Sequence, residues 1–282
     1  MPELPEVETV RRSLDPLVTG GAIVGAAFGD FSGSVAGTTP EEFTRGIVGR
    51  TIERLDRRGK FLLIRLNDQQ TIAVHLRMTG ELRLQHSGDP PLPHQHLAIL
   101  LDGNRELRFI DIRKFGRLRL LDQEGLTALD RSLGPEPLDA SALTPMAFYE
   151  RLQMRKRAIK TLLLDQSFLA GVGNIYADEA LFLAGIHPLR AASSLSTDEA
   201  AGLLSAIRSI LSASIAHHGT TLRDYRDGLG NSGENQHHLR IYHLREGDPC
   251  TRCGTGISRI VVGQRGTKYC SVCQPLQIPE QD

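Results

Sequence analysis

Two patterns of apolar residues divide the chain into a strand-rich part and a helix-rich part. Between residues 21 and 121, short apolar or alternating runs separated by turn residues predict antiparallel strands. From residue 144 onward, apolar residues recur at helical spacing. The expected strands include 60–66, 71–76, 97–101, 106–110 and 117–121. The expected fold class is therefore α+β, with an N-terminal antiparallel β-sandwich or barrel followed by a helical domain.

Helix-start signals support this division. Pro5 suits the first turn of an N-terminal helix with Val7, Val10 and Leu14 on one face. The pair Thr144-Pro145 is typical of a helix start. Ser196 and Glu199 match a capping box, which predicts a later helix with a long apolar face. Between the two parts, the Gly- and Pro-containing stretch 133–137 predicts a linker.

Length and composition describe an ordinary globular protein. The 282 residues, 40% of them hydrophobic, allow two domains with their own cores. The sequence shows no apolar run of 18 or more residues and no secretory leader, so we expect no membrane association and a cytoplasmic location. The 33 basic and 33 acidic residues give a net charge of zero, so any nucleic-acid surface must come from local arrangement.

The four cysteines predict a metal site near the end of the chain. They form two Cys-x-x-Cys pairs, Cys250 with Cys253 and Cys270 with Cys273, a spacing typical of a four-thiolate zinc site. Two disulfides are the alternative, which the absence of secretory features disfavours. Four protein ligands leave no position for water, so the Zn²⁺ is expected to be structural. The stretch 257–269 between the pairs predicts a hairpin with Arg265 at its tip, suited to a phosphate backbone.

The first residues predict a nucleophile. Removal of Met1 would leave Pro2 with a free secondary amine, and an α-amino group has a pKa of about 7.7 to 8.0, against about 10.4 for lysine. Attack on a sugar aldehyde carbon would give an iminium ion that cannot lose its charge by deprotonation, which favours elimination. Glu3 would serve as general acid or base. The alternative is an ordinary solvated chain end.

Other residues have the chemistry of a nucleic-acid contact. Lys60 lies at a strand start, and Asn174 suits the N-cap of an apolar helix where phosphate could bind. Five arginines and lysines, among them Lys160, crowd residues 151–160, and this stretch contains no acid. Phe115 and Arg113 share a loop, and an apolar wedge beside an arginine suits the separation of stacked bases.

Six separated motifs together resemble one family. They are Pro2–Glu8, Arg58–Lys60, His75–Gly80, Asp111–Gly116, Gly171–Ala177 and the cysteine hairpin. The chain resembles the formamidopyrimidine-DNA glycosylases, bacterial base-excision repair enzymes, over almost its whole length. The resemblance implies a β-sandwich, a helical domain with a helix–two-turns–helix motif, a zinc finger and duplex DNA as partner. We expect a monomer with a catalytic domain at 1–132, a linker at 133–143, a DNA-binding domain at 144–236 and a zinc-finger domain at 237–282.

The resemblance also implies roles for individual residues. Pro2 would attack C1′ of the damaged nucleotide, Glu3 would move protons, Glu6 would hold the terminus, and Lys60 would lie near the reaction centre. Asn174, Arg265 and His94 would contact phosphates, and Met78, Arg113 and Phe115 would fill the gap left by the everted base. Lys160, from the basic run, is also expected to bind DNA. Release of an oxidised purine and β,δ-elimination would follow.

Three points bear on this reading of the sequence. Many family members carry an aromatic pair in the loop that caps the everted purine, whereas residues 231–236 here are Asn-Ser-Gly-Glu-Asn-Gln. This departure concerns lesion preference. The related endonuclease VIII type, acting on oxidised pyrimidines, is the nearest alternative function. A zinc-finger protein that binds DNA without catalysis is the alternative from another class, and it would not need Pro2, Glu3 and Lys60.

Overall fold

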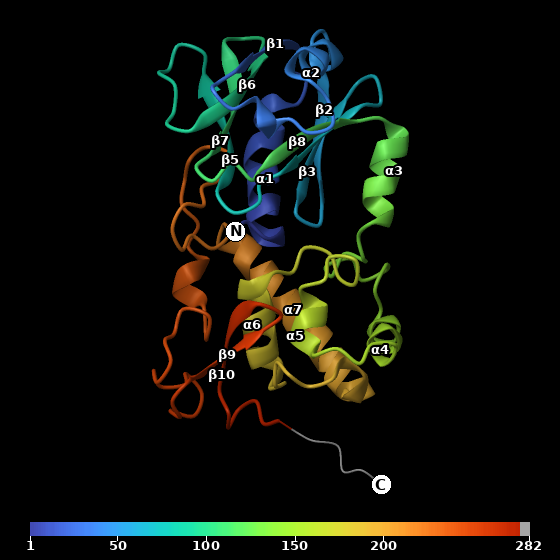
Figure 1. Ribbon diagram of the computed structural model, residues 1–282, viewed down its shortest axis with the longest axis vertical. Coiled ribbons are helices and arrows are strands. Elements are labelled where there is room, and N and C mark those ends of the chain that lie inside the picture. The colour runs from blue at the N-terminus through green and yellow to red at the C-terminus, as the bar shows by residue number, and fades with distance from the viewer. Residues whose placement is uncertain (277–282) are drawn as a thin grey trace. The chain divides into compact units, whose positions relative to one another are not determined.

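The computed structural model describes residues 1–276, and the chain forms two compact units (Figure 1). The first unit contains Met1–Arg131 and His217–Glu234. The second contains Ser132–Ala216 and the chain from Asn235 onward. The chain therefore leaves the first unit, returns to it for a short segment and leaves it again.

The first unit is built on two four-stranded antiparallel sheets, with strand orders β1-β6-β7-β5 and β2-β3-β4-β8. Apolar side chains of both sheets form one core cluster between them, so the unit is a β-sandwich. The strands are β1 (Ile23–Phe28), β2 (Ile52–Arg58), β3 (Phe61–Leu66), β4 (Thr71–His75), β5 (Gly80–His86), β6 (Gln95–Leu101), β7 (Arg105–Asp111) and β8 (Arg117–Leu121).

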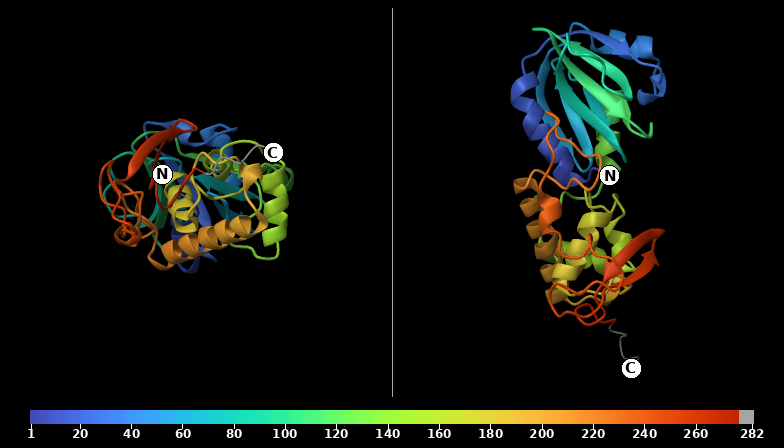
Figure 2. Two further views of the ribbon diagram at one scale, coloured as in Figure 1. Left: turned by 90° about the horizontal axis from the view of Figure 1, so that it is seen from below. Right: turned by 90° about the vertical axis from the view of Figure 1, so that its left-hand side faces the viewer.

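Helix α1 (Leu4–Val18) lies alongside this sandwich (Figure 2). It begins with a proline in its first turn and a capping box between Glu3 and Glu6, and its apolar face enters the sandwich core through Val7, Val10 and Leu14. The predicted amphipathic N-terminal helix is confirmed. The unit also contains α2 (Pro40–Ile47), α3 (Gln123–Arg131) and the 3₁₀ turn η1 (Ser32–Ser34).

The second unit packs four helices and a two-stranded hairpin. The helices are α4 (Pro145–Gln153), α5 (Ile159–Leu163), α6 (Asn174–Ala184) and α7 (Thr197–Ala216), with 3₁₀ turns η2 (Ala192–Ser194) and η3 (Asn235–His238). Strands β9 (Ser258–Val262) and β10 (Arg265–Tyr269) form the hairpin, which projects from the helices (Figure 2). The capping box of α7 is confirmed, since Glu199 N–H donates to Ser196 Oγ at 3.2 Å and Ser196 N–H donates to Glu199 at 2.9 Å.

Helix α7 is the one described helix that is long and apolar enough to cross a membrane by length and composition. It packs against α4 and α6 of the second unit. Arg208 on this helix donates hydrogen bonds to the carbonyls of Pro137 and Leu143. These contacts are typical of a core helix in a globular domain.

The β-sandwich and the predicted strands are confirmed, but the sequence pattern missed three strands and two helices. These are β1, β2, β5, α2 and α3. Strand β2 has the sequence Ile-Glu-Arg-Leu-Asp-Arg-Arg, with only Ile52 and Leu55 fully buried, so its polar residues obscure the alternation. Strand β5 likewise ends in half-exposed and exposed residues.

Three of the expected domain assignments differ from the compact units. Residues 217–234, expected in the helical domain, belong to the first unit because backbone groups of this segment bond to α1. The expected linker 133–143 is part of the second unit, where Gly134 N–H donates to Gln166 O at 2.8 Å. The zinc-finger segment shares a core with α6, including Phe182, so it is no separate unit. Its last expected residues, 277–282, lie outside the described residues.

Candidate catalytic terminus and nucleic-acid interface

The Glu6 carboxylate links the N-terminus to the returning segment of the first unit. Pro2 is buried, Glu3 and Glu6 are only 2% and 1% exposed, and Met1 is 41% exposed. The Glu6 side chain accepts hydrogen bonds from Glu3 N–H at 2.8 Å and from Thr220 N–H at 2.8 Å. Because the two donors are far apart in sequence, Glu6 fixes the terminus to the returning segment as well as to α1.

The returning segment, residues 217–234, also contacts the backbone carbonyl of Glu6. The Tyr225 hydroxyl donates to Glu6 O at 3.2 Å. Burial, and secondly the charge of Glu6, raises the pKa of Tyr225 well above its ordinary value, so this group stays a donor at neutral pH. Gly219 has a φ of +81°, in the left-handed region, and a Cβ there would lie 3.2 Å from the Glu6 side chain. No local pattern predicts this segment, because its bonds to α1 join residues more than 200 positions apart.

Lys60 lies in the turn between β2 and β3 and is 6% exposed. It follows Gly59, whose φ of 55° lies in the left-handed region. His75 at the end of β4 packs edge-on against Phe61, with ring centroids 4.6 Å apart. Burial, followed by the charges of Arg77 and Lys60, lowers the pKa of His75 to about 3. His75 is therefore neutral at pH 7, and its Nδ1 accepts from Arg77 N–H at 3.0 Å.

The loops after β4 and β7 are joined by Asp111, which is fully buried. Its carboxylate accepts from the Thr79 hydroxyl in the β4–β5 loop, and from Arg113 N–H at 3.1 Å and Gly116 N–H at 2.7 Å in the β7–β8 loop (residues 112–116). Three donors on one carboxylate fix both loops with charge-assisted bonds. Asp111 belongs to a motif recognised in the sequence, but its role was not predicted.

The three residues expected to fill the gap of an everted base lie on these joined loops. Met78 is half-buried in the first loop, and Arg113 and Phe115 are exposed in the second. Phe115 is 50% exposed, and the Arg113 guanidinium carbon lies 4.8 Å from its ring centroid. His94 is exposed, and its carbonyl accepts from Asp111 N–H at 3.0 Å. An exposed aromatic ring beside a cation has the chemistry of a base-stack wedge.

The second unit brings together Asn174 and the start of β10. Asn174 Nδ2 donates to Gly266 O at 3.2 Å and to the Tyr242 hydroxyl at 3.3 Å. The adjacent Arg265 is exposed. The expected N-cap role of Asn174 is wrong: Gly173 is the N-cap of α6, and Asn174 is the first residue of the helix. The α6 N-terminus and the hairpin cation therefore belong to one surface of this unit.

The expected DNA contact by Lys160 is also wrong for this structure, because the side chain is fully buried. Its ammonium lies 2.6 Å from the Asp178 carboxylate and donates to Thr267 Oγ1 at 2.6 Å. Burial raises the pKa of Asp178 to about 6, and the charge of Lys160 opposes this shift. Lys160 therefore holds α5, α6 and β10 together and leaves no ammonium for a phosphate.

A second acid of α6 holds the chain that leads to the cysteines. Glu179 is 1% exposed, and its carboxylate accepts backbone N–H groups from three consecutive residues. The distances are 2.8 Å from Arg240, 2.9 Å from Ile241 and 2.8 Å from Tyr242. Asp178 and Glu179 thus hold two different segments from adjacent positions. The sequence analysis missed both because acids in a helix are ordinarily solvated.

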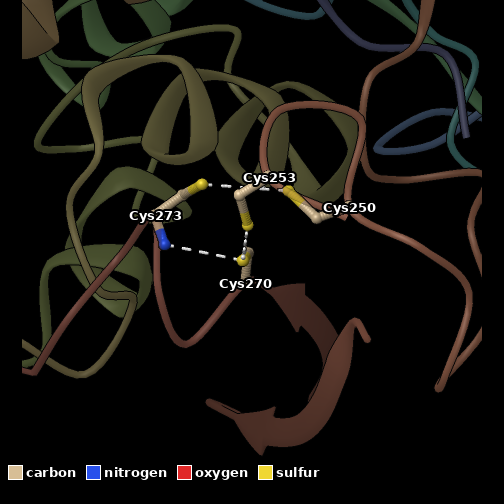
Figure 3. Close-up of side chains that lie close together, drawn as sticks. All are labelled: Cys250, Cys253, Cys270 and Cys273. Carbon is tan, nitrogen blue, oxygen red and sulfur yellow. Dashed lines mark hydrogen bonds between the residues drawn. The ribbon is translucent and has the colours of Figure 1, made fainter. Parts of the chain in front are cut away.

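The four cysteine side chains converge on one point (Figure 3). Their sulfur atoms all lie within 4.8 Å of one another, with Cys250 to Cys273 at 3.8 Å and Cys253 to Cys270 at 3.5 Å. Four thiolates at the Zn–S distance of about 2.3 Å span tetrahedral edges of about 3.8 Å. The donor set and its dimensions therefore fit one structural Zn²⁺, as the spacing predicts.

Family models match three stretches of the chain. They are the formamidopyrimidine-DNA glycosylase N-terminal domain over residues 1–118, the formamidopyrimidine-DNA glycosylase H2TH domain over 133–226, and the zinc finger found in FPG and IleRS over 247–276. A formamidopyrimidine-DNA glycosylase of Herpetosiphon aurantiacus is 53% identical over 97% of this chain and 100% of its own length. The formamidopyrimidine-DNA glycosylase of Thermomicrobium roseum is 47% identical over 98% of this chain and 100% of its own length.

Solved structures of the Lactococcus lactis enzyme are similar to this structure over almost the whole chain. A variant of it in complex with a Fapy-dG containing DNA has a TM-score of 0.90, with 36% identity over 97% of this chain and 100% of that one. The complex between the Lactococcus lactis enzyme and an abasic site containing DNA has a TM-score of 0.89, with 36% identity over 97% of this chain and 99% of that one. The expected fold and zinc finger are confirmed, and the chain belongs to the formamidopyrimidine-DNA glycosylase family of DNA glycosylase/AP lyase enzymes.

Proposed function

We propose that this enzyme excises oxidised purines, 8-oxoguanine and formamidopyrimidines, from duplex DNA and cuts the strand by β- and δ-elimination. The observation that carries the proposal is the buried Pro2-Glu3 terminus, where the Glu6 carboxylate accepts from Glu3 N–H and from Thr220 N–H. Similarity to an enzyme crystallised with Fapy-dG containing DNA supports the substrate class. We infer that the enzyme acts as a monomer in the bacterial cytoplasm, at the nucleoid.

The first step forms a bond from the Pro2 nitrogen to C1′ of the damaged nucleotide, after Met1 has been removed. The bond from C1′ to the base nitrogen breaks, and the base leaves with that electron pair and a proton. Glu3 donates a proton to the sugar ring oxygen as the ring opens, which leaves an iminium between Pro2 and C1′. A secondary amine suits this step because its iminium has no N–H proton to lose.

Elimination then follows from the acidity next to the iminium. A base removes a proton from C2′, and the 3′ phosphate leaves with the electron pair of its C–O bond. A second elimination expels the 5′ phosphate from the conjugated chain. Water hydrolyses the remaining adduct and returns the free amine. Glu3, as the buried acid next to the nucleophile, is the residue we assign to proton transfer.

The contacts with DNA are assigned by burial and position. Asn174 and Arg265 contact phosphates from the second unit, and His94 contacts another from the first. Lys60 contacts phosphate or the damaged base near the reaction centre. Met78, Arg113 and Phe115 fill the gap left by the everted base, which offsets an eversion cost of a few kcal/mol.

When bound, Zn²⁺ supplies a structural cross-link, because all four of its positions are taken by cysteine sulfur. Buried side chains of the second unit also hold the hairpin in place. Glu179 holds the segment before the first cysteine pair, and the Lys160–Asp178 pair holds β10 beside α6. Both arrangements keep Arg265 at a fixed place on the unit.

The proposal is tested with a duplex containing 8-oxoguanine opposite cytosine, compared with a duplex containing thymine glycol. We expect strand cleavage of the first that leaves phosphate on both ends of the gap. Residues added before Pro2 convert its amine to an amide and should abolish cleavage. Glu3→Gln should lower the rate on the order of 10²- to 10⁴-fold, the range of a general acid.

Three results would reject the proposal or part of it. Preferred cleavage of the thymine glycol duplex would favour the endonuclease VIII type of activity. Binding of both duplexes without cleavage would favour a DNA-binding protein without catalysis. Full activity of the extended chain would exclude Pro2 as nucleophile. Glu42→Gln, in the exposed capping box of α2, is the matched control and should keep wild-type rates.

A further inference from the structure

The β7–β8 loop rests on an aromatic side chain outside every motif described above. Phe31 lies between β1 and η1, in a segment that is bonded to both sheets of the first unit. Gly29 N–H donates to a carbonyl of β6 at 3.0 Å, and Ala36 N–H donates to a carbonyl of β8 at 2.9 Å. The half-buried Phe31 ring is therefore anchored by the sandwich on either side.

Two cations of the loop region lie over this ring. The Lys114 ammonium is 5.2 Å from the ring centroid, and the Arg117 guanidinium carbon is 5.8 Å from it. Both distances lie within the range of cation–π attraction. Lys114 has φ +59°, a conformation that residues other than glycine seldom adopt, so the loop needs support from outside its own backbone.

The neighbours of Phe31 also hold the loop backbone directly. Arg117 Nη1 donates to Lys114 O at 2.8 Å and to Gly116 O at 2.7 Å. His96 packs edge-on against Phe31 with ring centroids 5.3 Å apart, and its Nε2 lies 2.8 Å from Asp111 O at the start of the loop. The ring thus contacts the groups that fix both ends of the loop.

We propose that Phe31 is a positioning residue that fixes the β7–β8 loop in the shape needed for Arg113 and Phe115 to enter the base stack. The inference rests on the proposed function, because it assigns Phe31 to the step in which a damaged base leaves the stack. Phe31 acts through Lys114 and Arg117 and itself touches no DNA. Its loss therefore affects eversion of a base more than chemistry at a site that already lacks one.

The test compares Phe31→Leu, which keeps apolar bulk without a π face, with Phe31→Tyr, which keeps the ring. Single-turnover cleavage is measured on a duplex with 8-oxoguanine and on one with a preformed abasic site. Phe31→Leu should slow the first about tenfold, as expected for the loss of two cation–π contacts, and leave the second within about twofold. Phe31→Tyr should restore the wild-type rate.

A second readout follows the base stack itself. 2-Aminopurine placed beside the lesion gains fluorescence as the stack opens, and this rise should slow in Phe31→Leu. Phe28→Leu is the matched control: Phe28 is an equally half-buried ring three residues earlier that packs against Phe43. It should leave both the fluorescence rise and the ratio of the two cleavage rates unchanged.

Other outcomes would overturn the proposal. Equal loss of both activities in Phe31→Leu together with a lower melting temperature would make Phe31 an ordinary structural residue. Wild-type rates on both duplexes would show that the ring has no role. If the wild-type enzyme cuts neither duplex, the proposed function fails. The fluorescence rise on binding then still decides whether Phe31 controls the loop.

Discussion

The terminus of the first unit and the hairpin of the second present functional groups by opposite means. Pro2 and Glu3 are buried, and a single carboxylate, Glu6, holds them through backbone N–H groups. Arg265 is exposed on a short hairpin, and the groups that hold this hairpin are a buried ion pair and four thiolates. A nucleophile needs a fixed position and partial desolvation, whereas a phosphate contact needs an accessible charge on a rigid support.

The difference also determines whether a substitution changes stability, catalysis or DNA binding. At the terminus the functional groups are themselves part of the packing, so each substitution changes structure and chemistry together. On the hairpin the functional cation and its support are separate residues. Variants of the support should therefore change stability first, and variants of the cation should change binding alone.

The largest expected effect comes from the support of the hairpin. Asp178→Asn removes the carboxylate charge that lies 2.6 Å from the fully buried Lys160 ammonium, so we expect a loss of about 3 to 5 kcal/mol in unfolding free energy. Urea unfolding measures it. The double variant Lys160→Met with Asp178→Leu, which removes both charges, should recover most of the loss. A loss in the double variant as large as in Asp178→Asn would contradict the account.

A smaller effect is expected at the terminus. Glu6→Gln keeps the shape but removes the charge that accepts from Glu3 and Thr220, which should cost about 1.5 to 3 kcal/mol and slow cleavage. Glu42→Gln removes the same kind of carboxylate from the exposed capping box of α2, where solvent screens the charge, and should cost less than Glu6→Gln. Equal losses in the two variants would mean that Glu6 is an ordinary helix cap.

The pH dependence of stability tests the half-buried His75. The pKa of His75 is lowered to about 3, so the folded state disfavours its protonation. Neutral His75 contributes fully to the free energy of unfolding above the pKa of the unfolded state, near 6.5. This contribution is lost as the pH falls below that pKa. The wild type should lose about 1 kcal/mol per pH unit between pH 6 and 5 that His75→Gln does not lose. The exposed His86→Gln should behave like the wild type.

The smallest effect on stability is expected at the hairpin tip. Arg265→Ala should leave the melting temperature unchanged and weaken DNA binding uniformly across sequences. The slope of log affinity against log salt should fall by about 1, as for one lost phosphate contact. Arg259→Ala removes an exposed arginine from the facing strand β9 and is the matched control. An unchanged slope in Arg265→Ala would remove this residue from the interface.

The sequence predicted the features whose causes are local. The cysteine spacing encodes the ligand geometry, and the capping box of Ser196 and Glu199 depends on residues three positions apart. Strands with continuous apolar runs, such as β3 and β6, were also predicted correctly. Polar strands such as β2 were missed because their pattern resembles that of a solvated segment.

The features that the sequence did not predict depend on partners far along the chain. Lys160 belongs to a basic run, and only the structure shows that Asp178 neutralises it. The bond from Thr220 to Glu6 joins residues 214 positions apart, so no local pattern contains it. Phe31 lies in no motif, and its contacts with Lys114 and Arg117 appear only after the sheets have formed.

The central claim is that the amine of Pro2 forms a covalent bond with the sugar of the damaged nucleotide. Borohydride reduction of the enzyme mixed with a duplex containing 8-oxoguanine opposite cytosine should trap that bond. Digestion followed by mass spectrometry should then place the nucleotide on the N-terminal peptide, which begins at Pro2. A cross-link on Lys60 or another lysine, or no cross-link to this duplex or to an abasic one despite tight binding, would contradict the account.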